Sequence, residues 1–367
     1  MSNTPFDPSD HSHRRWNPLK NEWVLCSPHR TKRPWQGQTE EPDLTKLAQY
    51  DPKCYLCPGN KRMGDAQNPK YEGTFRFEND FAAVRELEVD MPESLAPPAA
   101  QRSDAVANLY KTEPARGKCF VMCFSPRHDL TIAQLKQEEM LRVIAEWQSL
   151  YREVSDTYDW IRYIQIFENK GSMMGCSNPH PHGQAWTLSY IPVEALKVLN
   201  SQKAFYETNK TNLLLEYAKA ELESESPRIV VKTEHFVALV PYWALWPFEV
   251  IICPTKRHIP HLLDLDEQEK DDLASVIRKM TCRYDNLFQC SFPYSMGIYQ
   301  APTLNDKDYA SSAQLHFAFD PPLLRSASVR KFLVGFELFG EPQRDLTAEQ
   351  AATKLQACSE VHYKPRD

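Results

Sequence analysis

CFVMCFSPRHDL, residues 119–130, decides the fold of this chain, because EVIICPTKRHIP at residues 249–260 repeats the same pattern. In each copy an apolar run carries a cysteine that lies five residues before a histidine, as Cys123 does before His128. Apolar runs rich in β-branched and aromatic residues predict buried strands. A pattern that returns later in the chain indicates an internal duplication.

The segments around the two copies follow one another in the same order. After each copy comes a segment with apolar residues at helical spacing, at about 132–155 and about 266–284. Each unit therefore reads strand, strand, helix, strand, strand. The alternative is that a few short apolar matches align by chance. The remaining segments of the pattern are 77–84, 161–167 and 174–186 in the first unit, and 233–240, 294–297 and 314–319 in the second.

Two copies of one unit predict an α+β fold, divided into residues 1–192 and residues 193–367. Helical-looking residues 193–225 connect the units. Residues 88–101 are rich in proline and acidic side chains, which predicts a surface excursion with little regular structure.

Composition places the chain among ordinary globular proteins, with 367 residues of which 42% are hydrophobic and 25% charged. Its 43 Lys and Arg are outnumbered by 49 Asp and Glu, and the net charge is -6. This balance provides no basic field for nucleic acid or an anionic membrane, so we expect neither as a partner. Residues 1–10 are polar and no apolar run is long enough to cross a bilayer, which predicts a cytoplasmic protein.

The ten cysteines are too sparse for a disulfide scaffold, and most stand singly in apolar segments. Cys54 and Cys57 differ because they form a C-x-x-C pattern in the polar stretch DPKCYLCPGNKR. This spacing is typical of a metal-binding knuckle or of a redox pair, and a cytoplasmic setting favours the metal.

GCSNPHPHGQ, residues 175–184, predicts a functional site. His180 and His182 lie two residues apart, and on an extended backbone such side chains point to the same face. The prolines at 179 and 181 stiffen the segment. A single histidine is more often a structural residue of the core, but two histidines in a polar loop of this kind favour a functional site.

Imidazole in such a loop can act as a metal ligand, a general base or a nucleophile. The nucleophilic role suits phosphoryl chemistry, because a phosphoramidate retains the potential to pass its group to a second acceptor. Donors for phosphate oxygens are Gly175, Ser177, Gly183 and Gln184.

The repeat assigns different residues to this loop in the two units. When the copies are aligned, His316 falls opposite His180 and Ala318 falls opposite His182. The alignment therefore predicts that only the first unit holds a nucleophilic second histidine.

Two short basic segments could contact a phosphate, because arginine forks bind its oxygens bidentately. Each segment alone is more often a solvated surface run. The cations are Arg30, Lys32 and Arg33 in residues 27–35, and Arg330 and Lys331 in residues 328–335.

Eight longer segments carry a resemblance that covers nearly the whole chain. They are SPHRTKRPW (27–35), CYLCPGN (54–60), FENDFAAV (77–84), FENKGSMMGCSNPHPHGQAW (167–186), VPYWALWPFE (240–249), RYDNLFQCSFPYSMG (283–297), PPLLRSASVRKFLVGFE (321–337) and QRDLTAEQAA (343–352). In these segments the sequence resembles the galactose-1-phosphate uridylyltransferase family of the histidine triad superfamily. The resemblance implies a duplicated half-barrel of antiparallel strands flanked by helices, assembled as a homodimer whose active sites are completed by the neighbouring subunit.

The resemblance also implies an activity and the residues that perform it. His182 would attack UDP-glucose, release glucose 1-phosphate and pass the uridylyl group to galactose 1-phosphate, forming UDP-galactose. By the same resemblance Gln184 and Ser177 would assist catalysis. The phosphates and ribose would contact Asn169, Gly175, Cys176, Ser177, Arg30 and Arg33; the base and ribose would contact Leu56, Met63, Phe77, Asn79 and Asp80; the hexose phosphate would contact Lys331, Phe332, Phe336, Glu337 and Gln343.

This sequence matches the residues of one metal site of the family but not those of the other. The zinc ligands map onto Cys54, Cys57, His128 and His180, a closed set of the kind that binds structural zinc. A second metal site found in some members does not carry over. Its positions fall at or near Val198, Tyr299, His316 and Ala318, which leaves one imidazole, so we expect one zinc per subunit and no second metal.

Two other functions compete with this interpretation. A dinucleoside polyphosphate phosphorylase would keep the covalent histidine and change the base and acceptor, but Asn79, Asp80 and the hexose-side residues argue against it. A non-catalytic zinc-binding homologue is suggested by the eroded second site and opposed by the intact HPHGQ segment.

Overall fold

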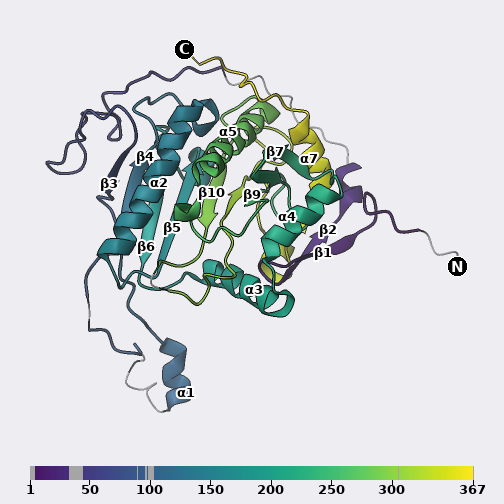
Figure 1. Ribbon diagram of the computed structural model, residues 1–367, viewed down its shortest axis with the longest axis horizontal. Helices are drawn as coiled ribbons and strands as arrows, with labels where there is room; N and C mark the ends of the chain where they lie inside the picture. The colour runs from purple at the N-terminus through teal and green to yellow at the C-terminus, as the bar shows by residue number, and fades with distance from the viewer. Residues whose placement is uncertain are drawn as a thin grey trace.

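The chain is described here by a computed structural model. The residues that it describes are 5–32, 44–88, 90–95, 97, 103–304 and 306–366. Within them a nine-stranded sheet forms the centre of the molecule, with the order β3-β4-β6-β5-β10-β11-β9-β8-β7 (Figure 1). Its strands are β3 Phe75–Glu78, β4 Gly117–Cys123, β5 Tyr163–Lys170, β6 His182–Leu188, β7 Ile229–Lys232, β8 Phe236–Leu239, β9 Val250–Pro254, β10 Tyr294–Tyr299 and β11 His316–Asp320.

The strand order contains the predicted repeat. β3, β4, β6 and β5 form one half, and β8, β9, β11 and β10 form the other half in the same internal order. The halves meet where β5 pairs with β10, antiparallel like every pair in this sheet. In both halves a long helix follows the second strand, α2 Gln137–Thr157 and α5 Glu267–Phe288. The α+β fold with its large antiparallel sheet and flanking helices is thus confirmed.

One face of the sheet is covered by α2 and α5, which lie side by side across it (Figure 1). Alternate strand residues point to that face, so the helices and strands share one apolar core. Trp147 of α2 lies at its centre without exposed surface. Its ring centroid is 6.2 Å from that of Phe124 and 5.9 Å from that of Phe317.

The opposite face of the sheet is covered only in part. Over the second half, α4 Leu213–Glu223 and the residues Val198 and Phe205 of α3 Val193–Asn209 pack in a cluster with Ile251 and Cys253. Over the first half, residues 54–57 pack on Val121 and Cys123. On the central strands between these clusters, side chains such as Phe167, Gln184 and Trp186 stay half-buried. This open strip is where the site described below forms.

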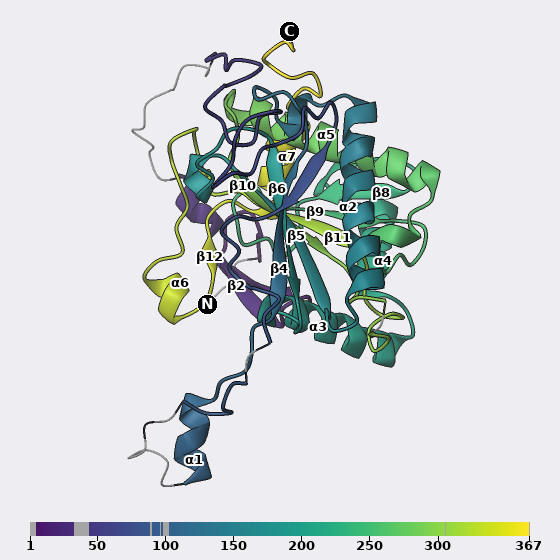
Figure 2. The same ribbon diagram turned by 90° about the vertical axis from the view of Figure 1, so that its left-hand side faces the viewer.

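The remaining elements lie around the sheet. Figure 2 shows α6 beside β12 and β2, and α1 at the end of an arm that extends away from the body. These elements are β1 His13–Asn17, β2 Glu22–Cys26 and β12 Gln343–Arg344 in a separate small sheet, the helices α1 Asp104–Ala107, α6 Phe336–Phe339 and α7 Ala348–Gln356, and short 3-10 turns that include Pro28–Lys32 and Ser172–Met174. Among the described residues, no helix combines the length and apolar character needed to cross a membrane.

Three sequence predictions of local structure were wrong in extent. The strand predicted at 77–84 ends at Glu78, because the Asn79 side chain accepts a hydrogen bond from the backbone of Phe81 and turns the chain. The single helix predicted at 193–225 is two helices, interrupted where Lys210 adopts a φ of 60°. The helix predicted from 132 begins at Gln137, after a 3-10 turn. The division into units at residue 192 stays a prediction.

We predict that Gly183→Ala destabilises the fold. An added Cβ would lie 2.7 Å from Phe124 Cζ and 2.9 Å from the Phe167 carbonyl oxygen, so β6 would have to move away from the helix layer. Overpacking of this kind costs about 1–3 kcal/mol, which urea unfolding can measure. Gly297→Ala is the matched control, because its Cβ meets only a side-chain nitrogen at 3.6 Å. Equal stability of the two variants would contradict this packing argument.

Candidate active site

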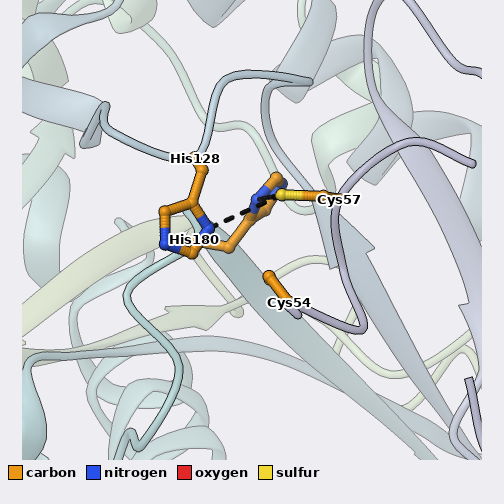
Figure 3. A group of neighbouring side chains, drawn as sticks. All are labelled: Cys54, Cys57, His128 and His180. Atoms are coloured by element: carbon orange, nitrogen blue, oxygen red, sulfur yellow. Dashed lines mark hydrogen bonds between the residues drawn. The ribbon is translucent and has the colours of Figure 1, made fainter. Parts of the chain in front are cut away.

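Four metal-binding side chains meet near the end of β4 and the start of β6 (Figure 3). Cys54, Cys57, His128 and His180 are buried, and their ligand atoms all lie within 4.8 Å of one another. The Cys57 sulfur lies 3.6 Å from Nδ1 of His128 and 3.5 Å from Nδ1 of His180. The fold therefore brings the predicted ligands into one cluster.

The geometry and chemistry of this cluster fit a tetrahedral ion such as zinc. Metal bonds of about 2.3 Å to sulfur and about 2.0 Å to nitrogen place the two ligand atoms about 3.5 Å apart. Burial lowers the pKa of His128. Burial also lowers the pKa of His180, to about 3, and the neighbouring His128 contributes to this shift. Both rings are therefore neutral. Burial also raises the pKa of the Cys57 thiol, so its ligating thiolate needs a cation beside it.

Contacts around His180 fix which of its nitrogens faces the cluster. Its Nε2 lies 2.9 Å from the carbonyl oxygen of Ser125 and 3.0 Å from the hydroxyl of Tyr71. Because the carbonyl can only accept, Nε2 carries the proton and Nδ1 presents its lone pair to the metal position. The Tyr71 hydroxyl itself donates to the carbonyl of Leu56.

The same reasoning identifies the reactive nitrogen of His182. Its Nδ1 lies 2.7 Å from the backbone carbonyl oxygen of His180, so Nδ1 carries the proton and Nε2 keeps a free lone pair. Burial lowers the pKa of His182, and the bond to the carbonyl opposes this only in part. The ring is therefore neutral near pH 7 and its Nε2 is available as a base or nucleophile.

Asn178 links the cluster to the loop before His182. Its side-chain amide donates to the Cys54 sulfur at 3.3 Å, and its side-chain oxygen accepts the backbone N–H of His180 at 3.0 Å. A single side chain thus ties the cysteine segment to the histidine segment.

The loop between β5 and β6 is shaped by two glycines in left-handed conformations, Gly171 with a φ of 87° and Gly175 with a φ of 79°. Within it, the backbone N–H of Gly175 donates to Ser172 and that of Cys176 donates to Gly171. Both N–H groups are therefore already hydrogen-bonded within the turn. They do not supply the free N–H groups that sequence reasoning expected from Gly175.

A pocket of about 150 Å³ opens beside His182. In the part of the chain that the structure describes, no protein hydrogen bond occupies the side-chain amide of Gln184 or the hydroxyl of Ser177. Asn169 is held by a bond of 2.7 Å from Ser295 to its side-chain oxygen, which leaves its amide nitrogen for the pocket. The lining residues are Tyr55, Asn169, Gly175, Cys176, Ser177, Asn178, His182, Gly183 and Gln184.

A fixed neutral imidazole beside unpaired donors suits the transfer of an anionic group, because the donors can stabilise charge that develops during transfer. The N-terminal domain model of the family described as galactose-1-phosphate uridyl transferase matches residues 4–192, and the C-terminal domain model matches residues 198–367. The chain belongs to the galactose-1-phosphate uridylyltransferase family.

Individual relatives support this membership over the full length. The galactose-1-phosphate uridylyltransferase of Saccharomyces cerevisiae is 50% identical over 372 residues, with 100% of both chains covered. That of Haemophilus influenzae is 50% identical over 361 residues, covering 98% of each chain. Among solved structures, a uridylyltransferase has a TM-score of 0.70 at 26% identity and covers 95% of this chain and 98% of its own.

One further solved structure shares the fold alone. It is an ADP-glucose phosphorylase from Arabidopsis thaliana with a TM-score of 0.71 and 20% identity, covering 95% of this chain and 100% of its own. The relatives that are about 50% identical to this chain are uridylyltransferases, and they support uridylyl transfer over the alternative of a dinucleoside polyphosphate phosphorylase.

Residues that the family resemblance assigns to the base and ribose gather around β3. Phe77 and Leu56 lie in one cluster beside the cysteine knuckle, and Leu56 has no exposed surface. Leu56 therefore supports this region from behind. Met63, in contrast, is 63% exposed.

Arg62 organises the polar part of this region. Its guanidinium lies 3.8 Å from the centre of the Phe77 ring, and its Nε is 3.5 Å from a carboxylate oxygen of Asp80. Asn79 is occupied in turning the chain after β3. Sequence reasoning did not single out Arg62.

A second, separate pocket of about 480 Å³ collects the hexose-side residues. Arg30 lies here, 3.3 Å from Asp345, and not beside His182 of the same chain. Arg33, predicted to act with Arg30, lies outside the described residues. The pocket is lined by Leu25, Ser27, Arg30, Leu324, Lys331, Phe332, Val334, Phe336, Glu337, Gln343 and Asp345, and Lys331 bonds to Glu337.

The structure corrects the alignment of the two units at the HPH segment. His182 pairs with Cys123, and the pairing of Phe317 with Ile252 places His316 opposite Cys253. His316 therefore corresponds to His182 and not to His180. The prediction failed because the register of these strands is set by pairing across the sheet, which short sequence matches do not reveal.

The positions of the second metal site lie together around one cavity of about 80 Å³. Val198, Tyr299, His316 and Ala318 all line it. The ring of Tyr299 stacks on His316 with centroids 4.9 Å apart, and Nδ1 of His316 bonds the Gln314 carbonyl at 2.8 Å. Aromatic and aliphatic side chains thus occupy positions where ligands would be needed.

Besides Arg62, sequence reasoning missed three residues of the site. Asn178 stood inside the quoted loop, yet nothing in the sequence indicated its bonds to both ligand segments. Tyr55 lines the pocket and lies between the two cysteines, which was a usable signal. Tyr71 reaches the cluster from a distant segment and carried no signal.

We predict that Cys57→Ala abolishes metal binding, because Cys57 contacts both ligand histidines. Elemental analysis should find about one metal ion per wild-type chain and almost none in the variant, with a lowered melting temperature. Cys123→Ala is the control, since Cys123 packs in the same cluster but is not a ligand. Full metal occupancy in Cys57→Ala would disprove the assignment.

At the cavity where the second metal site of the family would lie, we predict that His316→Asn leaves the metal content of the protein unchanged and lowers its stability modestly. Its stacking on Tyr299 would be lost, while no ligand would be removed. Elemental analysis of both proteins provides the measurement. Two metal ions per wild-type chain, with one missing in the variant, would show that His316 is a ligand.

Proposed function

We propose that this chain transfers a uridylyl group from UDP-glucose to galactose 1-phosphate through a covalent intermediate on Nε2 of His182. The observation that carries the proposal is the bond from His182 Nδ1 to the His180 carbonyl, which leaves Nε2 unprotonated beside the pocket. Family membership supports the choice of substrates.

In the first step Nε2 of His182 attacks the α-phosphorus of UDP-glucose. A nitrogen–phosphorus bond forms, and the bond from that phosphorus to the oxygen of glucose 1-phosphate breaks. The positive charge that develops on the ring is stabilised because Nδ1–H donates to the His180 carbonyl. The amide of Gln184 and the hydroxyl of Ser177 donate to the phosphoryl oxygens as their charge increases.

In the second step a phosphate oxygen of galactose 1-phosphate attacks the same phosphorus. The nitrogen–phosphorus bond breaks, its electron pair returns to Nε2, and UDP-galactose leaves. The histidine ends the cycle in its starting state, so one set of donors serves both transfers.

The nucleotide would lie between His182 and β3. The side-chain amide of Asn169 and the loop at Gly175, Cys176 and Ser177 would contact the phosphates and ribose. The base region would be formed by Phe77 and Met63 with Leu56 behind them, and by Asn79 and Asp80 at the ribose.

The hexose phosphate would be bound by residues of a second copy of the chain. Arg30 and the predicted hexose-side residues surround their own pocket, and among described residues it shares no lining residue with the pocket at His182. A homodimer in which each copy brings this pocket to its neighbour's His182 would unite nucleophile and acceptor. Lys331, Phe332, Phe336, Glu337 and Gln343 would then contact the sugar phosphate together with Arg30 and Arg33.

Zinc is the ion that we assign to the Cys54, Cys57, His128 and His180 cluster, because thiolate and imidazole ligands in a closed set are typical of structural zinc. When bound it joins the cysteine knuckle to the histidine segment. We also propose a cytoplasmic location: all ten cysteines lie in described residues and none forms a disulfide, as in a reducing compartment.

We predict that His182→Gly abolishes transfer and that free imidazole restores part of it, because the vacated space admits a surrogate nucleophile with the same kind of nitrogen. The assay follows radiolabel from UDP-glucose into UDP-galactose. His316→Gly is the control, since its position lies outside the pocket, and it should keep double-displacement activity. Activity of His182→Ala beyond a trace would refute the nucleophile.

We predict that two inactive variants complement each other when mixed. His182→Ala lacks the nucleophile, and Lys331→Ala lacks a contact of the second pocket. After dissociation and reassociation, a mixed dimer has one site with both residues intact, so activity should approach about a quarter of the wild-type level for random pairing at equal concentrations. Failure of a verified mixed dimer to recover activity would contradict shared sites.

A further inference from the structure

The last residues of the chain return to the end of the central sheet that carries the active site. After α7 the chain runs past the C-terminal part of α5 and ends near α2 (Figure 1). Chain ends are usually frayed unless specific contacts hold them. Here Asn286 of α5 accepts the N–H of Tyr363 at 2.8 Å, and Arg366 bonds Glu139 of α2 through both carboxylate oxygens.

Within this tail, His362 reaches a buried ion pair. Lys170 and Asp285 are joined by a bond of 2.6 Å, and their side chains are only 6% and 2% exposed. One oxygen of Asp285 accepts from Lys170 and from the N–H of Phe292. The other oxygen lies 3.1 Å from Nε2 of His362.

The negative charge of the buried Asp285 is stabilised by all of these partners. Burial would raise the pKa of Asp285, yet Lys170 and His362 together hold it below its ordinary value. A buried charge that loses one of its hydrogen bonds is costly, and neighbouring groups shift to compensate. Loss of His362 would therefore disturb the position of Lys170.

Lys170 stands at the entry to the active-site loop. It is the last residue of β5, between the pocket residue Asn169 and the left-handed Gly171 that starts the loop to His182. Its ammonium group is anchored on α5, while its backbone pairs with Tyr294 of β10. The ion pair thus fixes the point at which the strand passes into the loop.

We propose that His362 is a positioning residue for uridylyl transfer, acting through Asp285 and Lys170 on Asn169 and the loop before His182. The inference rests on the function proposed above. His362 lines neither the pocket of about 150 Å³ at His182 nor the neighbouring pocket of about 250 Å³ that also reaches His182, so it would align groups that touch the substrate without touching it. A displacement of such groups by about 1 Å can slow a reaction by about a hundred-fold.

A matched set of full-length variants separates positioning from simple anchoring of the tail. In His362→Gln the amide nitrogen reaches the place of Nε2 and still donates to Asp285. In His362→Asn the shorter amide reaches only the place of Nδ1, which bonds the backbone of Lys364. Arg366→Ala loosens the tail at Glu139 and leaves Asp285 untouched.

The experiment measures the single-turnover rate of uridylylation by UDP-glucose, with KM, metal content and melting temperature for each protein. We expect His362→Asn to lower the rate roughly ten-fold, with little change in KM or metal content. His362→Gln should retain nearly the wild-type rate. Arg366→Ala should lower the melting temperature and keep the rate.

Two results would overturn the proposal. One is a wild-type rate in His362→Asn; the other is an equal loss of rate in His362→Asn and Arg366→Ala, which would mean that the tail only stabilises the fold. If His362→Asn does not fold, His362→Ala takes its place, and a wild-type rate in it, or a rate loss equal to that in Arg366→Ala, has the same meaning. Failure of the proposed function would appear separately, as a wild-type protein that takes no label from UDP-glucose.

Discussion

The hydrogen bond between Nδ1 of His182 and the carbonyl oxygen of His180, 2.7 Å long, is the contact on which the proposed chemistry depends. It fixes the tautomer of His182 and the direction of its free nitrogen. The residue that provides this carbonyl is itself held, because the His180 ring contacts Ser125 on one side and Cys57 on the other. The cluster of Cys54, Cys57, His128 and His180 thus supports the segment that orients His182, which lies outside the cluster.

The sheet explains why this arrangement is rigid. Its helix-covered face is a continuous core from Phe120 to Phe319, and Gly183 lies against that core with no room for a side chain. His182 and Gln184 point from the same strand to the opposite, partly open face. The duplication then separates the roles of the halves: His316 repeats the carbonyl bond of His182, but Ala318 stands where Gln184 would be needed.

Regular patterns in the sequence predicted most of the fold and the centre of the site. The repeated strand–strand–helix–strand–strand order and the C-x-x-C and HPH segments are local signals, and the structure shows each of them as a strand pair, a helix or a ligand cluster. The second-unit counterpart of His182 was assigned wrongly, because register is set by pairing across the sheet. Tyr71, the Lys170–Asp285 pair and the bond from Asn178 to Cys54 carried no signal, since the partners lie far apart in the chain.

The tautomer of His182 can be measured directly by nitrogen NMR of the protein with ¹⁵N-labelled histidine, before and after reaction with UDP-glucose. The free protein should show His182 protonated at Nδ1 and bare at Nε2. The reacted protein should show phosphorus coupled to Nε2 of His182, and galactose 1-phosphate should remove that coupling. Phosphorus on Nδ1, or on any other residue, would contradict the account.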